Sequence, residues 1–172
     1  MKVLARDMII AAAVALVISF FIRPTIVRET SMLPTLQDGN YLLISRQAYR
    51  MENISRGDII VFRSGIQDKD GNKELLIKRV IGLPGDVITV AGGVVYRNGR
   101  ILEEKYIKGG AGSATPGEIY SLKVPEGRVF VMGDNRKVSI DSRYETVGTV
   151  KESDIMGKVF LRLYPFDEAG KI

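Results

Sequence analysis

The sequence predicts a mostly β protein in which one N-terminal helix precedes a single antiparallel, β-rich domain. Residues 8–22 form an uninterrupted run without a charged side chain, which is typical of a helix that is apolar on all sides. Beyond residue 35, short β-branched runs alternate with turn signals. The 172 residues, 45% of them hydrophobic, are enough for one domain with a buried core. We therefore divide the chain into residues 1–23 and residues 24–172.

The N-terminal segment favours a membrane anchor. The apolar run alone is short for a bilayer core of roughly 30 Å, and it reaches back to Val3 only by including two charged residues, which can lie at the interface. A cleaved signal peptide has a similar length, but no small-x-small cleavage site follows. A buried helix of a soluble protein stays open as an alternative. We expect an uncleaved single membrane span over residues 1–23. Basic residues flank it in equal number on both sides, so charge alone does not predict which end lies in the cytoplasm.

The remaining chain contains short runs that are typical of strands and of tight hairpins. Gly92-Gly93 and Asn98-Gly99 bracket one of these runs and predict a small meander. A polar loop tip is expected at residues 67–73, and a loop or flap at residues 109–117. The predicted strands cover residues 41–45, 58–63, 75–81, 86–91, 94–97, 119–124, 128–132 and 159–164.

Two absences in the composition restrict the chemistry. The chain has no Cys and no His, so it lacks thiolate ligands, the commonest metal ligand and the usual general base of serine hydrolases. No acidic cluster is spaced for an all-oxygen metal site, and we expect no metal and no other cofactor. The net charge of +5 fits a solvated surface, or contact with anionic lipid headgroups, better than a nucleic-acid interface.

Without His, a nucleophilic Ser can still work with a neutral Lys. A free Lys has a pKa of roughly 10.4, so it becomes a base only where apolar burial disfavours its charge. Three lysines lie in apolar runs: Lys78, Lys123 and Lys158. Lys78 is the most enclosed, since Leu76 and Val80 are its neighbours on one face of a strand. For Lys123 and Lys158, and nearly as much for Lys78, an ammonium in water at a strand edge is the commoner arrangement.

Ser31 lies shortly after the apolar segment, in the sequence ETSMLPTL. Pro34 disfavours a helical conformation at Leu33, so we expect a stiff turn and not a continuing helix. Such a turn would hold Ser31 in a fixed pose. A loop Ser that only caps a turn is the commoner case on these residues alone.

Four sequence motifs stand out along the chain: Ser31–Thr35 (SMLPT), Gly57–Phe62 (GDIIVF), Ile77–Asp86 (IKRVIGLPGD) and Gly133–Arg143 (GDNRKVSIDSR). Together they resemble bacterial type I signal peptidases, or leader peptidases. Each motif alone is a weak signal, but they occur in the order of that family, behind one apolar N-terminal segment, and cover nearly the whole chain. The chain length is similar to the compact, Gram-positive-like form.

The resemblance implies a membrane-bound serine endopeptidase that removes signal peptides from exported preproteins at the outer face of the membrane. It implies a single-pass protein with its N-terminus in the cytoplasm, whose partners are preprotein signal peptides and membrane lipid, with no nucleic acid. Ser31 would be the nucleophile and Lys78 the general base. Ser139 would hydrogen-bond the Lys78 amine and orient it, and Asp141 and Arg143 would form a supporting ion pair.

The sequence departs from the family pattern in two loops. Glu29 stands where some relatives carry a Ser whose hydroxyl helps to build the oxyanion hole. An ionised Glu cannot donate a hydrogen bond, so the hole must rest on the Ser31 backbone N–H and a donor that the sequence does not identify. Lys137-Val138 replaces a polar pair at a loop tip, a change that we expect to be tolerated. The second β-domain of larger relatives is expected to be absent or reduced to residues 65–73 and the 92–118 meander.

Two other functions stay open at this point. A self-cleaving Ser–Lys protease of the SOS-repressor kind shares the fold class, but such a protein needs a DNA-binding domain where this chain has an apolar segment. A catalytically inactive, membrane-tethered β-module that binds peptides is the second alternative. The presence of both Ser31 and Lys78 argues against it.

Overall fold

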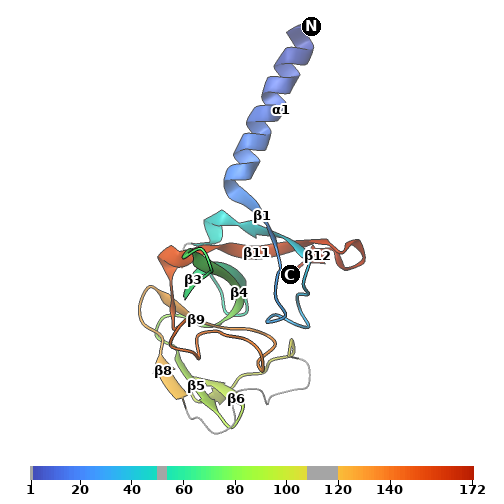
Figure 1. Cartoon of the computed structure of the whole chain (residues 1–172). Helices are drawn as coiled ribbons and strands as arrows, with labels where there is room; N and C mark the ends of the chain where they lie inside the picture. The colour runs from blue at the N-terminus through green and yellow to red at the C-terminus, as the bar shows by residue number, and fades with distance from the viewer. Residues whose placement is uncertain (1, 50–53, 108–119) are drawn as a thin grey trace.

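The N-terminal helix stands apart from the β-rich remainder of the chain. The computed structural model describes residues 2–49, 54–107 and 120–172, and in it α1 (Lys2–Phe21) projects away from the strands (Figure 1). Within these ranges, no helix combines the length and the apolar character needed to cross a membrane. Strand β1 (Ile22–Ile26) follows α1 directly. The last two residues assigned to the N-terminal segment, 22 and 23, therefore belong to the β-structure.

The described strands form two antiparallel sheets, which confirms the mostly β fold class. The larger sheet has eight strands in the order β1-β2-β11-β3-β4-β9-β10, with β12 paired to β11. Its further strands are β2 (Tyr41–Ser45), β3 (Ile59–Gln67), β4 (Lys73–Gly82), β9 (Arg128–Met132), β10 (Val150–Lys151), β11 (Ile155–Tyr164) and β12 (Gly170–Lys171). The described residues also include three short 3-10 helices: η1 (Arg46–Tyr49), η3 (Glu152–Asp154) and η4 (Phe166–Glu168).

A second sheet of four described strands has the order β7-β6-β5-β8 and is antiparallel throughout. Its strands are β5 (Val87–Ala91), β6 (Val94–Arg97), β7 (Arg100–Ile101) and β8 (Tyr120–Lys123). The hairpin turns lie where the sequence predicts them, and Asn98 and Gly99 both adopt positive φ. The segment is more than a meander, because its inward side chains bury an apolar cluster of their own with Phe130 and Met132. The expected loop at residues 109–117 lies outside the described residues.

Three strands are longer than the sequence pattern predicts, because β3 also continues past residue 63 to Gln67. β4 begins at Lys73, and the polar loop before it shrinks to residues 68–72, where the Asp68 carboxylate accepts N–H groups of Asp70 and Asn72. β11 begins at residue 155 and includes Gly157, which reads as a strand breaker in the sequence. A Cβ at Gly157 would lie 2.6 Å from the Ser45 carbonyl oxygen of β2, so this glycine permits close strand pairing.

Two apolar clusters of the larger sheet fix the segments that carry the site. One cluster includes Leu76 and Val80 of β4, both buried. The other includes Met32 and Leu36, which are 1% and 0% exposed and lie in the turn after β1. The Leu36 N–H donates a 2.9 Å hydrogen bond to the Met32 carbonyl. The core therefore holds both this turn and the middle of β4 rigidly.

Candidate active site

The structure brings Ser31 and Lys78 together from positions that are 47 residues apart in sequence. Lys78 Nζ lies 2.7 Å from Ser31 Oγ, at hydrogen-bonding distance. Lys78 is 1% exposed and Ser31 7% exposed. The pair is therefore both in contact and shielded from bulk water.

Strand β4 supplies the environment of Lys78. It runs between β3 and β9, and the same-face neighbours Leu76 and Val80 are 4% and 1% exposed, as the alternation predicts. Burial lowers the pKa of Lys78 below its ordinary value of 10.5. Charging an amine at this position requires that it lose its hydration shell, so the neutral form is favoured.

Three carboxylates oppose this effect of burial. The negative charges of Glu29, Asp141 and Glu74 each raise the pKa of Lys78, but burial is the larger influence and the net shift is downward. The protonation state of Lys78 is therefore set by a balance between an apolar strand and nearby acidic side chains.

The backbone around Ser31 is held by the loop that begins at Gly133. The Asn135 N–H donates to the Ser31 carbonyl oxygen at 3.0 Å, and the Asn135 side chain donates to the Thr30 carbonyl at 3.2 Å. None of the hydrogen bonds among the described residues uses the Ser31 N–H. The turn predicted at Ser31 thus fixes one side of its peptide and leaves an N–H donor beside Oγ.

The other two candidate lysines lie away from Ser31. Lys158, on β11, forms a 2.7 Å ion pair with Asp58. Lys123, at the end of β8, is exposed. Lys123 matches the expected ammonium in water at a strand edge, whereas Lys158 is a half-buried ion pair on the inner strand β11.

Ser139 is buried near the Ser31 backbone, but it does not form the expected hydrogen bond to Lys78. Its side chain is 1% exposed, and Oγ has no hydrogen-bond partner among the described residues. Gly133 packs against it: a Cβ at Gly133 would lie 2.2 Å from Ser139 Oγ and 2.5 Å from the Ser31 carbonyl oxygen. A buried hydroxyl without a partner is costly, so Ser139 has a free hydrogen-bonding group close to the site.

Asp141 and Arg143 form the ion pair that the sequence predicts. Arg143 Nε and Nη2 donate to the two oxygens of the fully buried Asp141 carboxylate at 2.8 and 2.9 Å. The Gly133 N–H donates to the same carboxylate at 2.9 Å, and Arg143 also reaches the Ser139 carbonyl at 3.2 Å. The pair therefore closes the loop from Gly133 to Arg143 on itself.

Residue pattern alone misses a second bidentate pair next to Lys78. Arg79 Nε and Nη2 donate to Asp134 at 2.8 and 2.6 Å, and Thr35 Oγ1 donates to the same carboxylate at 2.5 Å. Arg79 follows Lys78 on β4, so it points to the opposite face, toward the turn that carries Thr35. The pair joins the Ser31 turn, β4 and the loop at Asp134. The only available signal was the presence of Arg79 and Asp134 in two of the four motifs.

A further buried pair joins the small sheet to this loop. Arg136 and Glu104 are 1% and 5% exposed and form a bidentate contact, and the Tyr106 hydroxyl donates to Glu104 at 2.7 Å. The Arg79 guanidinium lies over the Tyr106 ring, 4.0 Å from its centre. Burial of the phenol and the nearby Glu104 charge raise the pKa of Tyr106. Glu104 and Tyr106 come after β7, where no motif marks them.

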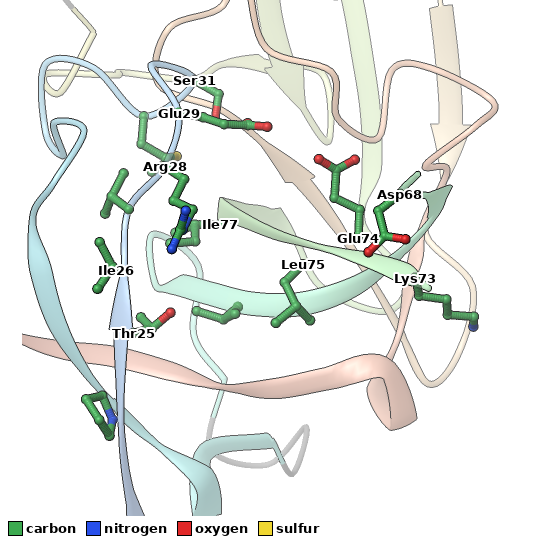
Figure 2. A pocket seen from close by; sticks show the side chains of 14 residues that line it. Thr25, Ile26, Arg28, Glu29, Ser31, Asp68, Lys73, Glu74, Leu75 and Ile77 are labelled. Carbon is green, nitrogen blue, oxygen red and sulfur yellow. The ribbon is translucent and has the colours of Figure 1, made fainter. Parts of the chain in front are cut away.

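A groove of about 750 Å³ opens at Ser31, the exposed side of its contact with Lys78. The segment from Pro24 to Met32 forms one wall, and β4 from Lys73 to Ile77 forms the other (Figure 2). On its outer side, β4 pairs with β9 only from Arg79 onward, so within the described residues the preceding part of that edge has no strand partner. A second hollow, of about 480 Å³, adjoins the first at Ser31 and is lined partly by Val138 and Ile140.

No other type of reactive centre is evident in the parts of the chain that the structure describes. In these ranges, no group of three or more acidic side chains is arranged to hold a metal ion. The arrangement therefore combines a hydroxyl, a buried amine in contact with it and an open groove beside the hydroxyl.

The sequence is similar to known proteins over nearly its full length. Residues 1–164 match the family described as signal peptidase, peptidase S26. The chain is 38% identical over 170 residues to a probable signal peptidase I-2 of Synechocystis sp., covering 97% of this chain and 75% of that protein. It is 38% identical over 165 residues to signal peptidase I U of Bacillus subtilis, covering 92% and 84%.

A crystal structure of a signal peptidase I from Enterococcus faecalis is also similar, at 33% identity, and the match covers 61% of this chain and 95% of that one. Its TM-score of 0.49 is too low to support an argument about the fold. The match to the family over residues 1–164, together with these identities, shows that this chain belongs to the signal peptidases of peptidase family S26.

Proposed function

We propose that this protein removes signal peptides from exported preproteins with Ser31 as nucleophile and Lys78 as general base. The observation that carries the proposal is the 2.7 Å contact between Lys78 Nζ and Ser31 Oγ at a groove. Burial supplies what an amine base needs, because it lowers the pKa of Lys78 and so favours the form that can accept a proton.

The proposed reaction proceeds through an acyl-enzyme. Neutral Lys78 accepts the Ser31 hydroxyl proton while Oγ attacks the scissile carbonyl. The Lys78 ammonium then gives that proton to the leaving amine, and the peptide bond breaks. A water molecule then attacks the ester carbonyl while Lys78 takes its proton. The bond to Ser31 Oγ breaks, Lys78 returns the proton to Oγ, and the product leaves with its new carboxyl group.

Supporting roles are proposed for four further groups. The unused Ser31 backbone N–H would donate to the oxyanion. Ser139 Oγ, buried and unpartnered among the described residues, would hydrogen-bond the Lys78 amine once the amine moves away from Ser31. Asp141 and Arg143 would hold the loop that carries Ser139.

The preprotein would bind in an extended conformation along the groove. The unpaired edge of β4 before Arg79 can accept a peptide as an added strand, with the segment before Ser31 on the other side. Small side chains are expected at the first and third positions before the scissile bond, as in A-x-A-like cleavage sites. A large residue just before the bond should abolish processing.

We further propose that the enzyme works at the outer face of the cell membrane, with its N-terminus in the cytoplasm. Two points support this orientation. Residues 8–22 carry no charge, as a membrane-spanning segment requires, and exported preproteins reach the outer face of the membrane, where they would be cleaved. Protease added to intact spheroplasts should digest residues 24–172. Full protection of that part would contradict this orientation.

The function is tested with the purified full-length protein and a preprotein. Wild type should release the mature protein with the N-terminus expected from its cleavage site, and Ser31→Ala should not. Circular dichroism should show that both proteins are folded. Equal cleavage by Ser31→Ala would exclude Ser31 as the nucleophile, and no cleavage by wild type would contradict the proposed activity.

A further inference from the structure

We propose that Glu29 and Glu74 make the groove selective for peptides with a basic side chain close to the scissile bond, and against peptides with an acidic one there. The inference rests on the proposed function, because it concerns the substrate of the same groove. It concerns charge selection, which is separate from the small side chains expected at the cleavage site.

Both carboxylates lie at the reacting end of the groove. Glu29 precedes Ser31 by two residues on one wall, and Glu74 is on β4, on the same face of the strand as Lys78. Both residues line the groove and also the adjoining hollow, which meet at Ser31. Figure 2 shows the Glu29 side chain beside Ser31 and the Glu74 carboxylate directed to the same side of the groove. A peptide that reaches Ser31 must therefore pass both carboxylates.

Neither carboxylate has an ion pair or a hydrogen bond among the described residues, and this distinguishes them from the other acidic groups near the site. Asp134 is paired with Arg79, Asp141 with Arg143, and Glu104 with Arg136. The charges of Glu29 and Glu74 do reach Lys78, where each acts to raise its pKa. Two unpaired negative charges thus act on the reacting atoms from opposite walls.

The basic side chains of the groove do not neutralise these two carboxylates. Arg28 points toward Ile77, away from Ser31 (Figure 2). Lys73 lies 3.7 Å from Asp154 outside the groove. Asp68, which lines the groove near Glu74, adds a third negative charge and receives hydrogen bonds only from its own loop. The end of the groove near Ser31 therefore carries a net negative charge.

This charge favours an ammonium or guanidinium on the peptide. The first and third residues before the scissile bond are expected to be small, so a basic side chain can occupy the second position before the bond or the first position after it. Glu29 is exposed and Glu74 half-buried, so water screens each interaction and the combined effect stays moderate. Charges close together but partly solvated predict a preference of roughly tenfold between a basic and an acidic residue.

The test uses the full-length protein in detergent and two series of peptides. Each series is identical except for Lys, Gln or Glu at one position: the second before the bond or the first after it. The specificity constant kcat/KM should fall in the order Lys, Gln, Glu in at least one series, by roughly tenfold from first to last at low salt, and the spread should shrink at high salt. Glu29→Gln and Glu74→Gln should each reduce the spread, and the double variant should remove it.

Glu126→Gln is the matched control, because Glu126 is an exposed acid in the turn between β8 and β9 and does not line the groove. It should leave the spread unchanged. Equal cleavage of the three peptides in both series, or a spread that survives in the double variant, would overturn the inference while the proposed function stands. If wild type fails to cleave even the Gln peptides, the proposed function fails, and the inference fails with it.

Discussion

Lys78 Nζ reaches Ser31 Oγ at 2.7 Å from a strand whose neighbouring side chains on the same face are buried in the core. The Lys78 side chain is thus fixed at its base by β4, and its amine contacts the Ser31 hydroxyl. Lysine in this position cannot keep its hydration shell, and burial lowers its pKa.

Activity should therefore rise with pH through an apparent pKa below 10.5, since the base is the deprotonated amine. Lys78→Arg keeps the charge but does not deprotonate, and we expect it to be as inactive as Lys78→Ala. Lys123→Arg and Lys158→Arg are the controls and should retain activity. The measurement is a pH–rate profile for wild type and the variants. An active Lys78→Arg enzyme would exclude Lys78 as the base.

Gly133→Ala should inactivate the enzyme. Its new methyl group would collide with Ser139 Oγ and with the Ser31 carbonyl oxygen, so the loop or the Ser31 turn must move. A displacement of reacting groups by about 1 Å can cost roughly 100-fold in rate. Gly170→Ala is the matched control, because a Cβ there meets nothing within 4 Å. The measurement is the steady-state kcat of both variants. A wild-type kcat in Gly133→Ala would contradict the prediction, because it would show that the loop can move without displacing the reacting groups.

Loss of the Arg79–Asp134 pair should destabilise the fold more than loss of a surface pair. Asp134→Asn leaves the buried Arg79 charge without its bidentate partner, which typically costs about 3–5 kcal/mol. Lys73→Ala removes an exposed ion pair with Asp154 and should cost less than about 1 kcal/mol. Urea unfolding at neutral pH gives both values. Similar losses for the two variants would show that the buried pair contributes no more than a surface one.

Asp86 should make the stability of the fold depend on acid pH. Burial of its carboxyl raises its pKa, but hydrogen bonds from Arg56, the Leu83 N–H and Asn98, with the Arg56 charge, outweigh this and lower the pKa to about 2. The stabilisation is complete above the unfolded-state value of 3.8 and is lost as the pH falls through about 2.

The comparison is Asp86→Asn against wild type, with the free energy of unfolding measured from pH 6 to pH 2. Wild type should be more stable at pH 6, and the difference should shrink as the pH approaches 2. A difference that is independent of pH would assign the effect to the lost ion-pair geometry and not to titration of Asp86.

The sequence predicted the local features and the motif residues better than the long-range pairing. Alternation along β4 predicted that Leu76 and Val80 flank Lys78 in the core, and the Asn98-Gly99 turn followed from glycine conformational preference. β11 was predicted too short, because Gly157 resembles a strand breaker until the close approach of Ser45 is known. Local pattern cannot report which backbone lies opposite a glycine.

The ion pairs around the site could not be predicted as pairs. Arg79 and Asp134 are 55 residues apart, and Glu104 lies 32 residues from Arg136. Each contact depends on how the two sheets and a loop pack against one another. The local periodicity of hydrophobic residues in one sequence does not reveal that packing. Ser139 shows the opposite case: its position in the motif placed it near Lys78, but its hydroxyl has no partner among the described residues.

The direct passage from α1 into β1 sets a limit on where cleavage can occur. Ser31 follows Phe21, the last residue of the helix, by only ten residues. A fully extended chain covers at most about 3.6 Å per residue, so Ser31 can never lie more than about 36 Å from the end of α1. Any surface that held α1 would therefore limit how far from that surface a bound peptide could be cut.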